Sequence, residues 1–125
     1  MSFSLTTSVS TYPRFKYEAM KDAILGKHYE LSLVFIGKTR AATLNKKYRN
    51  KSYSPNVLSF PLEKKTGEIF ICPQIAQSEA KKFSLSPRGY VAFLFIHGCL
   101  HLKGLDHGAT MDTQEQKFLR LFDIS

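Results

Sequence analysis

Three of the four histidines in this 125-residue chain lie within His97–His107, a segment that reads HGCLHLKGLDH. His97 and His101 are four residues apart, so on a helix both imidazoles project from the same face and can reach one small cation. Gly104 can adopt the left-handed conformation that ends a helix, and the following chain then returns His107 toward the same point. The segment therefore predicts one zinc ion (Zn²⁺) per chain, bound by His97, His101 and His107.

The predicted ligand set has the chemistry of a catalytic site. Three neutral imidazoles leave the fourth position of a tetrahedral zinc ion open, whereas structural sites are closed by four protein ligands. Water at such a position ionises near neutral pH and becomes a nucleophile. Cys99 is the candidate for a fourth, structural ligand, but it lies two residues from each helical histidine and is therefore expected on the opposite side, in the core. His28, the remaining histidine, follows a predicted helix end and is expected at the surface.

Two residues beside the histidines bear on the reaction. Asp106 either accepts a hydrogen bond from a ligating imidazole or caps the turn, and the sequence leaves both roles open. Gly98 stands where the H-E-x-x-H-x-x-G-x-x-H helix of metzincin proteases carries the glutamate that acts as general base. Its presence argues against peptide hydrolysis, and we expect it to leave space beside the metal for a bulky substrate group.

The elements that hold these residues are predicted from apolar periodicity and from capping signals. Expected strands cover residues 2–9, 30–36, 56–60 (closed by Pro61) and 68–72, the last two forming a hairpin. Expected helices cover 13–26, 39–49 (with Thr39 as N-cap), 73–83, 88–102 (after Ser86 and Pro87) and a last helix from about 111, with Asp112 and Glu115 as a capping pair. The helix at 88–102 is apolar around most of its circumference, so it must be central. The pattern predicts an α+β fold: a small mixed β-sheet packed with helices around one buried central helix that carries the metal site.

Composition and charge limit the class of protein. The length suits one domain, residues 1–125, and 43% hydrophobic with 22% charged residues is ordinary for a globular protein. We expect a cytoplasmic protein with no membrane partner, because no apolar run reaches the ~18 residues of a span, the start lacks a secretory signal and two cysteines make no disulfide framework. The net charge of +8 favours a polyanionic partner such as RNA, the alternative being that the charge only keeps the protein soluble.

Basic residues cluster in the predicted helix 39–49 and just after it. Arg49 ends this helix shortly before the strand at 56–60. If its guanidinium reaches the metal cleft, it can hold a phosphate through two hydrogen bonds; otherwise it is a solvated arginine on a basic face. The neighbouring lysines either form a track for RNA or are simply a solvated face: Lys46, Lys47 and Lys51. The neighbouring tyrosines either stack on bases or pack at the rim of the core: Tyr48 and Tyr53.

The histidine segment is similar to the H-G-x-L-H-L-x-G-[aromatic]-D-H signature of the YbeY family, bacterial endoribonucleases and rRNA maturation factors. The blocks LNKKYR (44–49), NVLSFP (56–61) and GEIFI (67–71) resemble that family's L-N-x-x-[aromatic]-R, [DN]-V-L-S-F-P and G-[DE]-I-x-I motifs in the same order. The resemblance spans about residues 30–120. Leu105 replaces the usual aromatic residue and the chain is shorter than is common, but neither departure touches a ligand. The resemblance implies an α+β fold, one zinc on the three histidines, a functional arginine at Arg49 and action on ribosomal RNA precursors in the cytoplasm.

The first functional hypothesis is therefore a single-strand-specific zinc-dependent endoribonuclease in rRNA maturation and ribosome quality control. Its expected partners are ribosomal RNA or its precursors, with ribosomal proteins as further candidates and no DNA. The sequence identifies no general base, although Glu68 and Asp106 are candidates. One alternative is a non-catalytic ribosome-assembly factor with a structural zinc. Another is a metallohydrolase on a different substrate, against which Gly98 and the charge count. The expected catalytic residues are Arg49, His97, His101 and His107.

Overall fold

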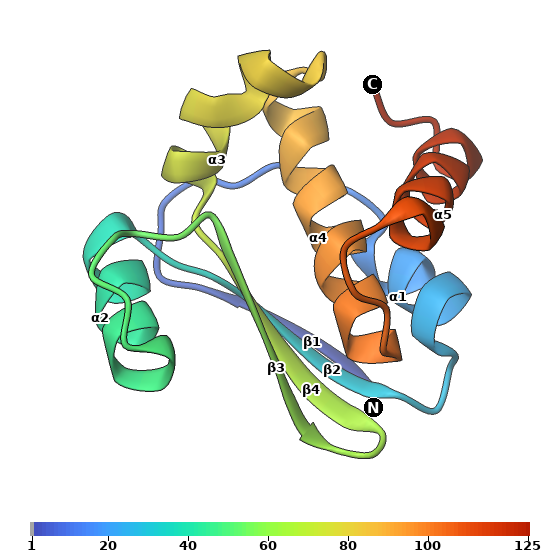
Figure 1. The fold of residues 1–125 in the computed structure, drawn as a ribbon, viewed down its shortest axis with the longest axis horizontal. Helices are drawn as coiled ribbons and strands as arrows, with labels where there is room; N and C mark the ends of the chain where they lie inside the picture. Colours follow the sequence, from blue (N-terminus) through green and yellow to red (C-terminus); the bar gives the residue numbers. More distant parts are fainter. Residues whose placement is uncertain (1) are drawn as a thin grey trace.

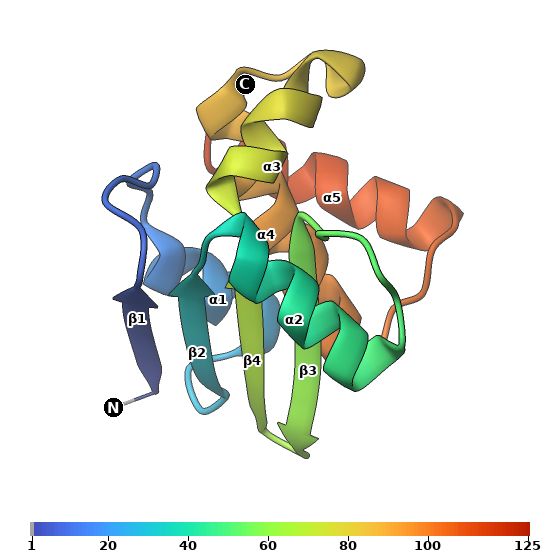
Figure 2. The ribbon, with the colours of Figure 1, turned by 90° about the vertical axis from the view of Figure 1, so that its left-hand side faces the viewer.

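The computed structural model describes residues 2–125 and contains one four-stranded sheet. The strands β1 (Phe3–Thr7), β2 (Glu30–Phe35), β4 (Thr66–Ile71) and β3 (Val57–Glu63) lie side by side in that order (Figure 2). β2 pairs in parallel with β1 and β4, while β3 pairs antiparallel with β4 across a hairpin. The mixed sheet and its helices confirm the predicted α+β class.

Helices lie on both faces of the sheet. α1 (Tyr17–Leu25), α4 (Pro87–Lys103) and α5 (Ala109–Leu121) lie on one side, and α2 (Lys38–Arg49) lies on the other (Figure 1). α3 (Pro73–Glu79) and the 3₁₀ helix η1 (Ala80–Phe83) connect β4 to α4. Because side chains alternate along a strand, each face of the sheet contributes side chains to a separate apolar cluster. The large cluster lies beneath α1, α4 and α5, and the small one lies beneath α2.

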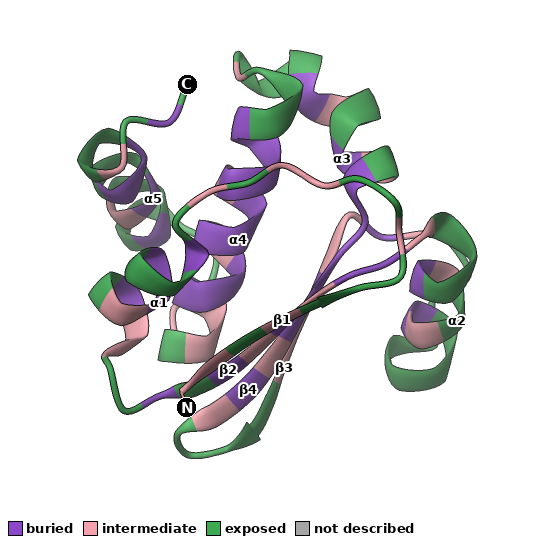
Figure 3. Cartoon of the chain, turned by 180° about the vertical axis from the view of Figure 1, so that it is seen from behind, coloured by how far each residue is buried: buried purple, intermediate pink, exposed green. Residues whose placement is uncertain are grey.

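α4 begins and ends at the residues that the sequence predicted. The Ser86 hydroxyl accepts a hydrogen bond from the Gly89 N–H at 3.0 Å, and Pro87 takes the first helical position, where no N–H is needed. Gly104 ends the helix in the left-handed conformation with φ of 110°. Ten of the seventeen residues of α4 are buried (Figure 3). Cys99 is one of them, and burial raises the pKa of its thiol.

Gly98 lets α4 approach the sheet closely, which corrects the expectation that it opens space for substrate. A Cβ at this position would lie 2.7 Å from Ser59 Oγ and 3.1 Å from Ile69 Cδ1. The space beside Gly98 is therefore filled by side chains of β3 and β4. The glycine sets how near the histidine-bearing helix stands to the edge strand β3.

Several predicted element ends were wrong, each for a local reason. α1 begins at Tyr17 rather than near Pro13, and the Tyr17 hydroxyl donates to the Pro13 carbonyl at 2.7 Å. Thr39 is not the N-cap of α2, because Gly37 takes that position and Thr39 lies in the first turn. Pro61 does not close β3, which continues to Glu63 with an irregular register, because an edge strand tolerates a residue without an N–H.

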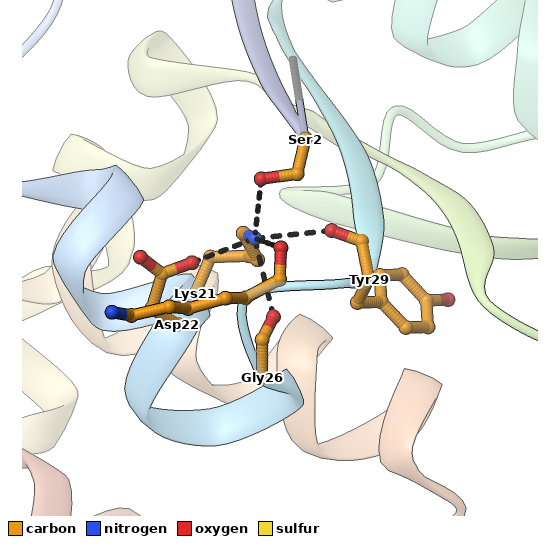
Figure 4. A network of polar contacts seen from close by, with 6 residues as sticks. Ser2, Lys21, Asp22, Gly26 and Tyr29 are labelled. Atoms are coloured by element: carbon orange, nitrogen blue, oxygen red, sulfur yellow. Dashed lines mark hydrogen bonds and ion pairs between the residues drawn. The ribbon is translucent and has the colours of Figure 1, made fainter.

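A buried lysine ties the first helix to the sheet. Lys21 is 0% exposed, and its Nζ donates to the Tyr29 and Gly26 carbonyls at 3.0 and 3.2 Å (Figure 4). It also donates to Ser2 Oγ at 3.2 Å and pairs with Asp22 Oδ1 at 2.7 Å. One ammonium thus joins the end of α1, the loop to β2 and the start of β1.

Among residues 2–125, no helix has both the length and the apolarity needed to cross a bilayer.

Replacing Lys21 with methionine should destabilise the protein, although the position is buried and methionine is apolar. Lys21→Met keeps the aliphatic volume but removes the hydrogen bonds to the Tyr29 and Gly26 carbonyls and the ion pair with Asp22, so we expect a loss of about 3 kcal/mol in the free energy of unfolding. Urea denaturation measures it. The matched control is Lys27→Met, at an exposed lysine, with a change below about 0.5 kcal/mol. Equal stability of the two variants would show that the buried network contributes nothing.

Candidate metal centre

The two helical histidines face each other near the C-terminal end of the buried helix α4. His97 and His101 lie one turn apart on α4, and their Nε2 atoms are 3.0 Å apart. The Nδ1 atom of His97 contacts a carboxylate oxygen of Glu115 on α5. The Nδ1 atom of His101 lies 3.1 Å from the carbonyl oxygen of Leu105. Each ring is therefore fixed through its outer nitrogen, and its inner nitrogen points at its neighbour.

These partners determine where the protons lie. A carbonyl or carboxylate oxygen only accepts, so the Nδ1 atoms of both His97 and His101 carry hydrogen and donate it. In the neutral rings, both Nε2 atoms then present lone pairs to each other at 3.0 Å. Two facing lone pairs repel unless a cation lies between them. This arrangement of ligand and hydrogen-bonded outer nitrogen is the one that metal-binding histidines adopt.

The turn after α4 brings the third histidine to the same place. The left-handed Gly104 reverses the chain, and the Leu105 N–H closes the turn by donating to the Leu100 carbonyl at 3.0 Å. The same turn presents the Leu105 carbonyl to His101 and returns His107 to the pair. The ring centre of His107 lies 5.1 Å from that of His97 and 5.0 Å from that of His101.

The three imidazoles fit a bound metal ion. One nitrogen from each of His97, His101 and His107 lies within 4.8 Å of the others. Two ligand nitrogens of a tetrahedral ion with bonds of ~2.0–2.1 Å lie about 3.3 Å apart, so this cluster is close to the size that is needed. Burial, followed by the nearby His97 and His107, lowers the pKa of His101. The lowered pKa favours the neutral ring, which is the form that binds metal.

Glu115 is the site residue that sequence reasoning missed. Asp112 and Glu115 were predicted to cap α5, but Gly108 takes the N-cap position and no side chain caps the helix. Glu115 is instead buried, 5% exposed, and contacts His97. The signal was present in the sequence: a carboxylate on the apolar face of α5, four residues after Met111 and three before Phe118. Asp106 is exposed, and among residues 2–125 its side chain takes neither of the two alternative roles, since it accepts no hydrogen bond from an imidazole or from the turn.

The histidines open onto a cavity of about 410 Å³ between α4 and the edge of the sheet. Arg49, at the end of α2, lines this cavity, so the structure brings together all four residues that were predicted to be catalytic. In the described part of the chain, no carboxylate lies within 4 Å of the Arg49 guanidinium. The cavity is lined by Arg49, Val57, Leu58, Ser59, His97, His101 and His107.

The other candidates lie elsewhere. Glu68 lines a separate hollow with β1 and β2 residues rather than the metal cavity. Cys99 is fully buried in the large core cluster, as predicted, and His28 is exposed, also as predicted. Val57 and Ser59 of β3 also line the cavity; they belong to the NVLSFP block at 56–61, but the sequence assigned them no role at the site.

The chain is similar to known proteins over most of its length. The family model described as Endoribonuclease YbeY matches residues 6–121. The chain is 36% identical over 115 residues to the Endoribonuclease YbeY of Mesoplasma florum, covering 83% of this chain and 65% of that protein. It is 33% identical over 123 residues to that of Neisseria meningitidis serogroup B, covering 86% and 72%. The aligned part thus spans about two thirds of the length of these relatives.

A solved structure has the same fold. The solution structure of TM1509 from Thermotoga maritima superposes with a TM-score of 0.64 at 23% identity, covering 94% of this chain and 87% of that one. At this identity, the likeness concerns the fold alone.

Removing the carboxylate behind His97 should weaken metal binding. Glu115→Ala leaves the His97 ring without the acceptor that orients it, so we expect metal affinity to fall about 10- to 100-fold. Competition with a chromophoric chelator measures this. Glu115→Gln can still accept the hydrogen bond but lacks the charge, so its metal affinity should lie between those of the parent and Glu115→Ala. The matched control on the same helix is the exposed Asp112→Ala. If Glu115→Ala loses no more metal affinity than this control, Glu115 has no role at the metal.

Proposed function

Because this chain belongs to the YbeY family, we propose that it is a zinc-dependent endoribonuclease that cleaves single-stranded RNA. The observation that carries the proposal is the pair of Nε2 atoms of His97 and His101 aimed at each other, with His107 beside them, on a cavity that Arg49 also lines. The proposal treats residues 1–125 as one metal-dependent hydrolase domain, with Arg49, His97, His101 and His107 as its catalytic residues.

Zinc is the metal that suits this donor set best. Three imidazoles without a thiolate or carboxylate among the ligands are typical of catalytic zinc, whereas magnesium and calcium prefer oxygen ligands. We propose one zinc per chain on His97, His101 and His107. When bound, it supplies positive charge and Lewis acidity for activating water or polarising a phosphoryl oxygen.

The residues of the chain divide the remaining work. Glu115 and the Leu105 carbonyl hold the two helical imidazoles in the orientation that binds metal. Arg49 is proposed to bind the scissile phosphate through two hydrogen bonds and to stabilise its developing negative charge. No carboxylate of residues 2–125 lines the cavity, so the proposal assigns no side chain as general base.

The substrate is proposed from charge and from the family. A net charge of +8 favours a polyanion, and the relatives named above are endoribonucleases by name. We propose ribosomal RNA or its precursors as the partner, in rRNA maturation and ribosome quality control in the cytoplasm, with ribosomal proteins nearby and no DNA substrate. The competing function is a ribosome-assembly factor that binds RNA around a structural zinc without cutting it.

Cleavage of a single-stranded RNA separates the two functions. Since His101 is proposed to hold the metal and Arg49 the phosphate, His101→Ala and chelator should abolish cleavage, while Arg49→Ala should slow it about 100-fold or more. RNA binding should fall much less than cleavage. Cleavage is followed by gel electrophoresis of an end-labelled RNA, and binding by fluorescence anisotropy.

The matched control for Arg49→Ala is Arg40→Ala, at an arginine on the same helix that does not line the cavity. It should cut RNA like the parent. If His101→Ala and Arg49→Ala also cut like the parent, the activity belongs to a contaminant and the assembly-factor function is favoured.

A further inference from the structure

An exposed tyrosine lies on the last turn of α2, on the outer side of the edge strand. Tyr48 is 58% exposed, an unusual degree for a large aromatic side chain. Its ring packs on one side against Phe60 of β3, with ring centres 5.3 Å apart, and Phe60 in turn packs against Phe70. The ring is therefore supported from beneath by the small apolar cluster and remains open to solvent.

Two segments of the chain link Tyr48 to the metal cavity. Arg49, which follows Tyr48, lines the cavity, and so does Ser59, which precedes Phe60. Because successive side chains of a strand point to opposite faces, Ser59 faces α4 while Phe60 faces α2, and β3 is the edge strand of the sheet. A strand of RNA with a phosphate at Arg49 has only the edge of β3 to cross before it meets the Tyr48 ring.

The charges around Tyr48 suit a polyanion. α2 carries five basic residues and no acidic residue, and the Lys47 Nζ lies 5.2 Å from the centre of the Tyr48 ring. Within residues 2–125, none of the basic side chains of α2 is paired with a carboxylate. Unpaired cations beside an exposed aromatic ring are the two components of sites that bind single-stranded nucleic acid.

The other exposed aromatic residues lack this combination. Tyr53 is 54% exposed but has no aromatic neighbour among the described residues. Phe83 is 49% exposed and stacks on Tyr90 at 4.8 Å, at the far end of α4 from the metal-facing turn. Neither residue adjoins one that lines the cavity. Phe83 therefore serves as a matched control for the chemistry of an exposed ring.

We propose that Tyr48 is the stacking platform for the nucleobase next to the phosphate bound at Arg49, so that single-stranded RNA crosses the edge of β3 between cavity and platform. This inference rests on the proposed function, whose substrate path it specifies. Every base has a flat face, so such a platform reads single-strandedness rather than sequence. Bases within a duplex are already stacked on each other and are not available to it.

The absence of tryptophan from the sequence allows a direct test. Tyr48→Trp places one indole at the platform, and its fluorescence is quenched when a base stacks on it. The metal-loaded protein is mixed rapidly with an oligouridine of about twelve nucleotides, so that quenching is read before cleavage. Probes of the same length are an abasic oligomer, which has phosphates without bases, and a duplex RNA.

We expect saturable quenching of Tyr48→Trp by oligouridine, and little by the abasic oligomer or the duplex. Phe83→Trp should not be quenched by any of them. In anisotropy titrations, Tyr48→Ala should bind oligouridine about tenfold more weakly, Tyr48→Phe should match the parent within about twofold, and Phe83→Ala should be unchanged.

Three results would overturn the platform: no quenching of Tyr48→Trp although RNA binds, equal quenching by the abasic oligomer, or the same loss of affinity in Tyr48→Phe as in Tyr48→Ala. RNA cleavage by the same samples distinguishes this failure from failure of the proposed function. Cleavage without quenching leaves the nuclease and removes the platform, whereas quenching without cleavage leaves an RNA-binding platform and removes the nuclease.

Discussion

The candidate metal site depends on one arrangement: the Nε2 atoms of His97 and His101 are held 3.0 Å apart with their lone pairs facing each other. This arrangement is unfavourable in itself, and α4 maintains it because the helix is buried and cannot easily rotate. Glu115 and the Leu105 carbonyl prevent either ring from turning its donor inward. The surrounding protein thus favours a cation at one point, and the reversal at Gly104 brings His107 there as a third candidate ligand.

Three parts of the chain that are distant in sequence converge on this point. α4 supplies two histidines, α5 supplies the carboxylate behind one of them, and the edge strand β3 supplies the opposite wall of the cavity. Gly98 sets the distance between helix and strand, because any side chain there would collide with Ser59. α2 lies on the other face of the sheet, yet Arg49 at its end lines the same cavity. Both faces of the sheet therefore contribute to one site.

The sequence predicted what depends on local spacing. The histidine interval, the Ser86–Pro87 start and the Gly104 end each follow from the geometry of one helix, and the mixed sheet follows from strands and helices of ordinary length. What it did not predict depends on contacts between elements. Glu115 was interpreted as part of a capping pair because nothing local shows that α5 packs beside His97. Gly98 was interpreted as open space because β3 and β4, which fill that space, are distant in the chain.

The most direct measurement is X-ray absorption spectroscopy at the zinc edge of the zinc-loaded protein, since it reads the ligand atoms and their distances. We expect three imidazole nitrogens and one further oxygen or nitrogen at ~2.0–2.1 Å, with no sulfur. A sulfur neighbour at ~2.3 Å would mean that Cys99 or Cys72 closes the site, and fewer than three imidazoles would mean that the histidines do not converge on the ion; either result would overturn the proposed open metal centre.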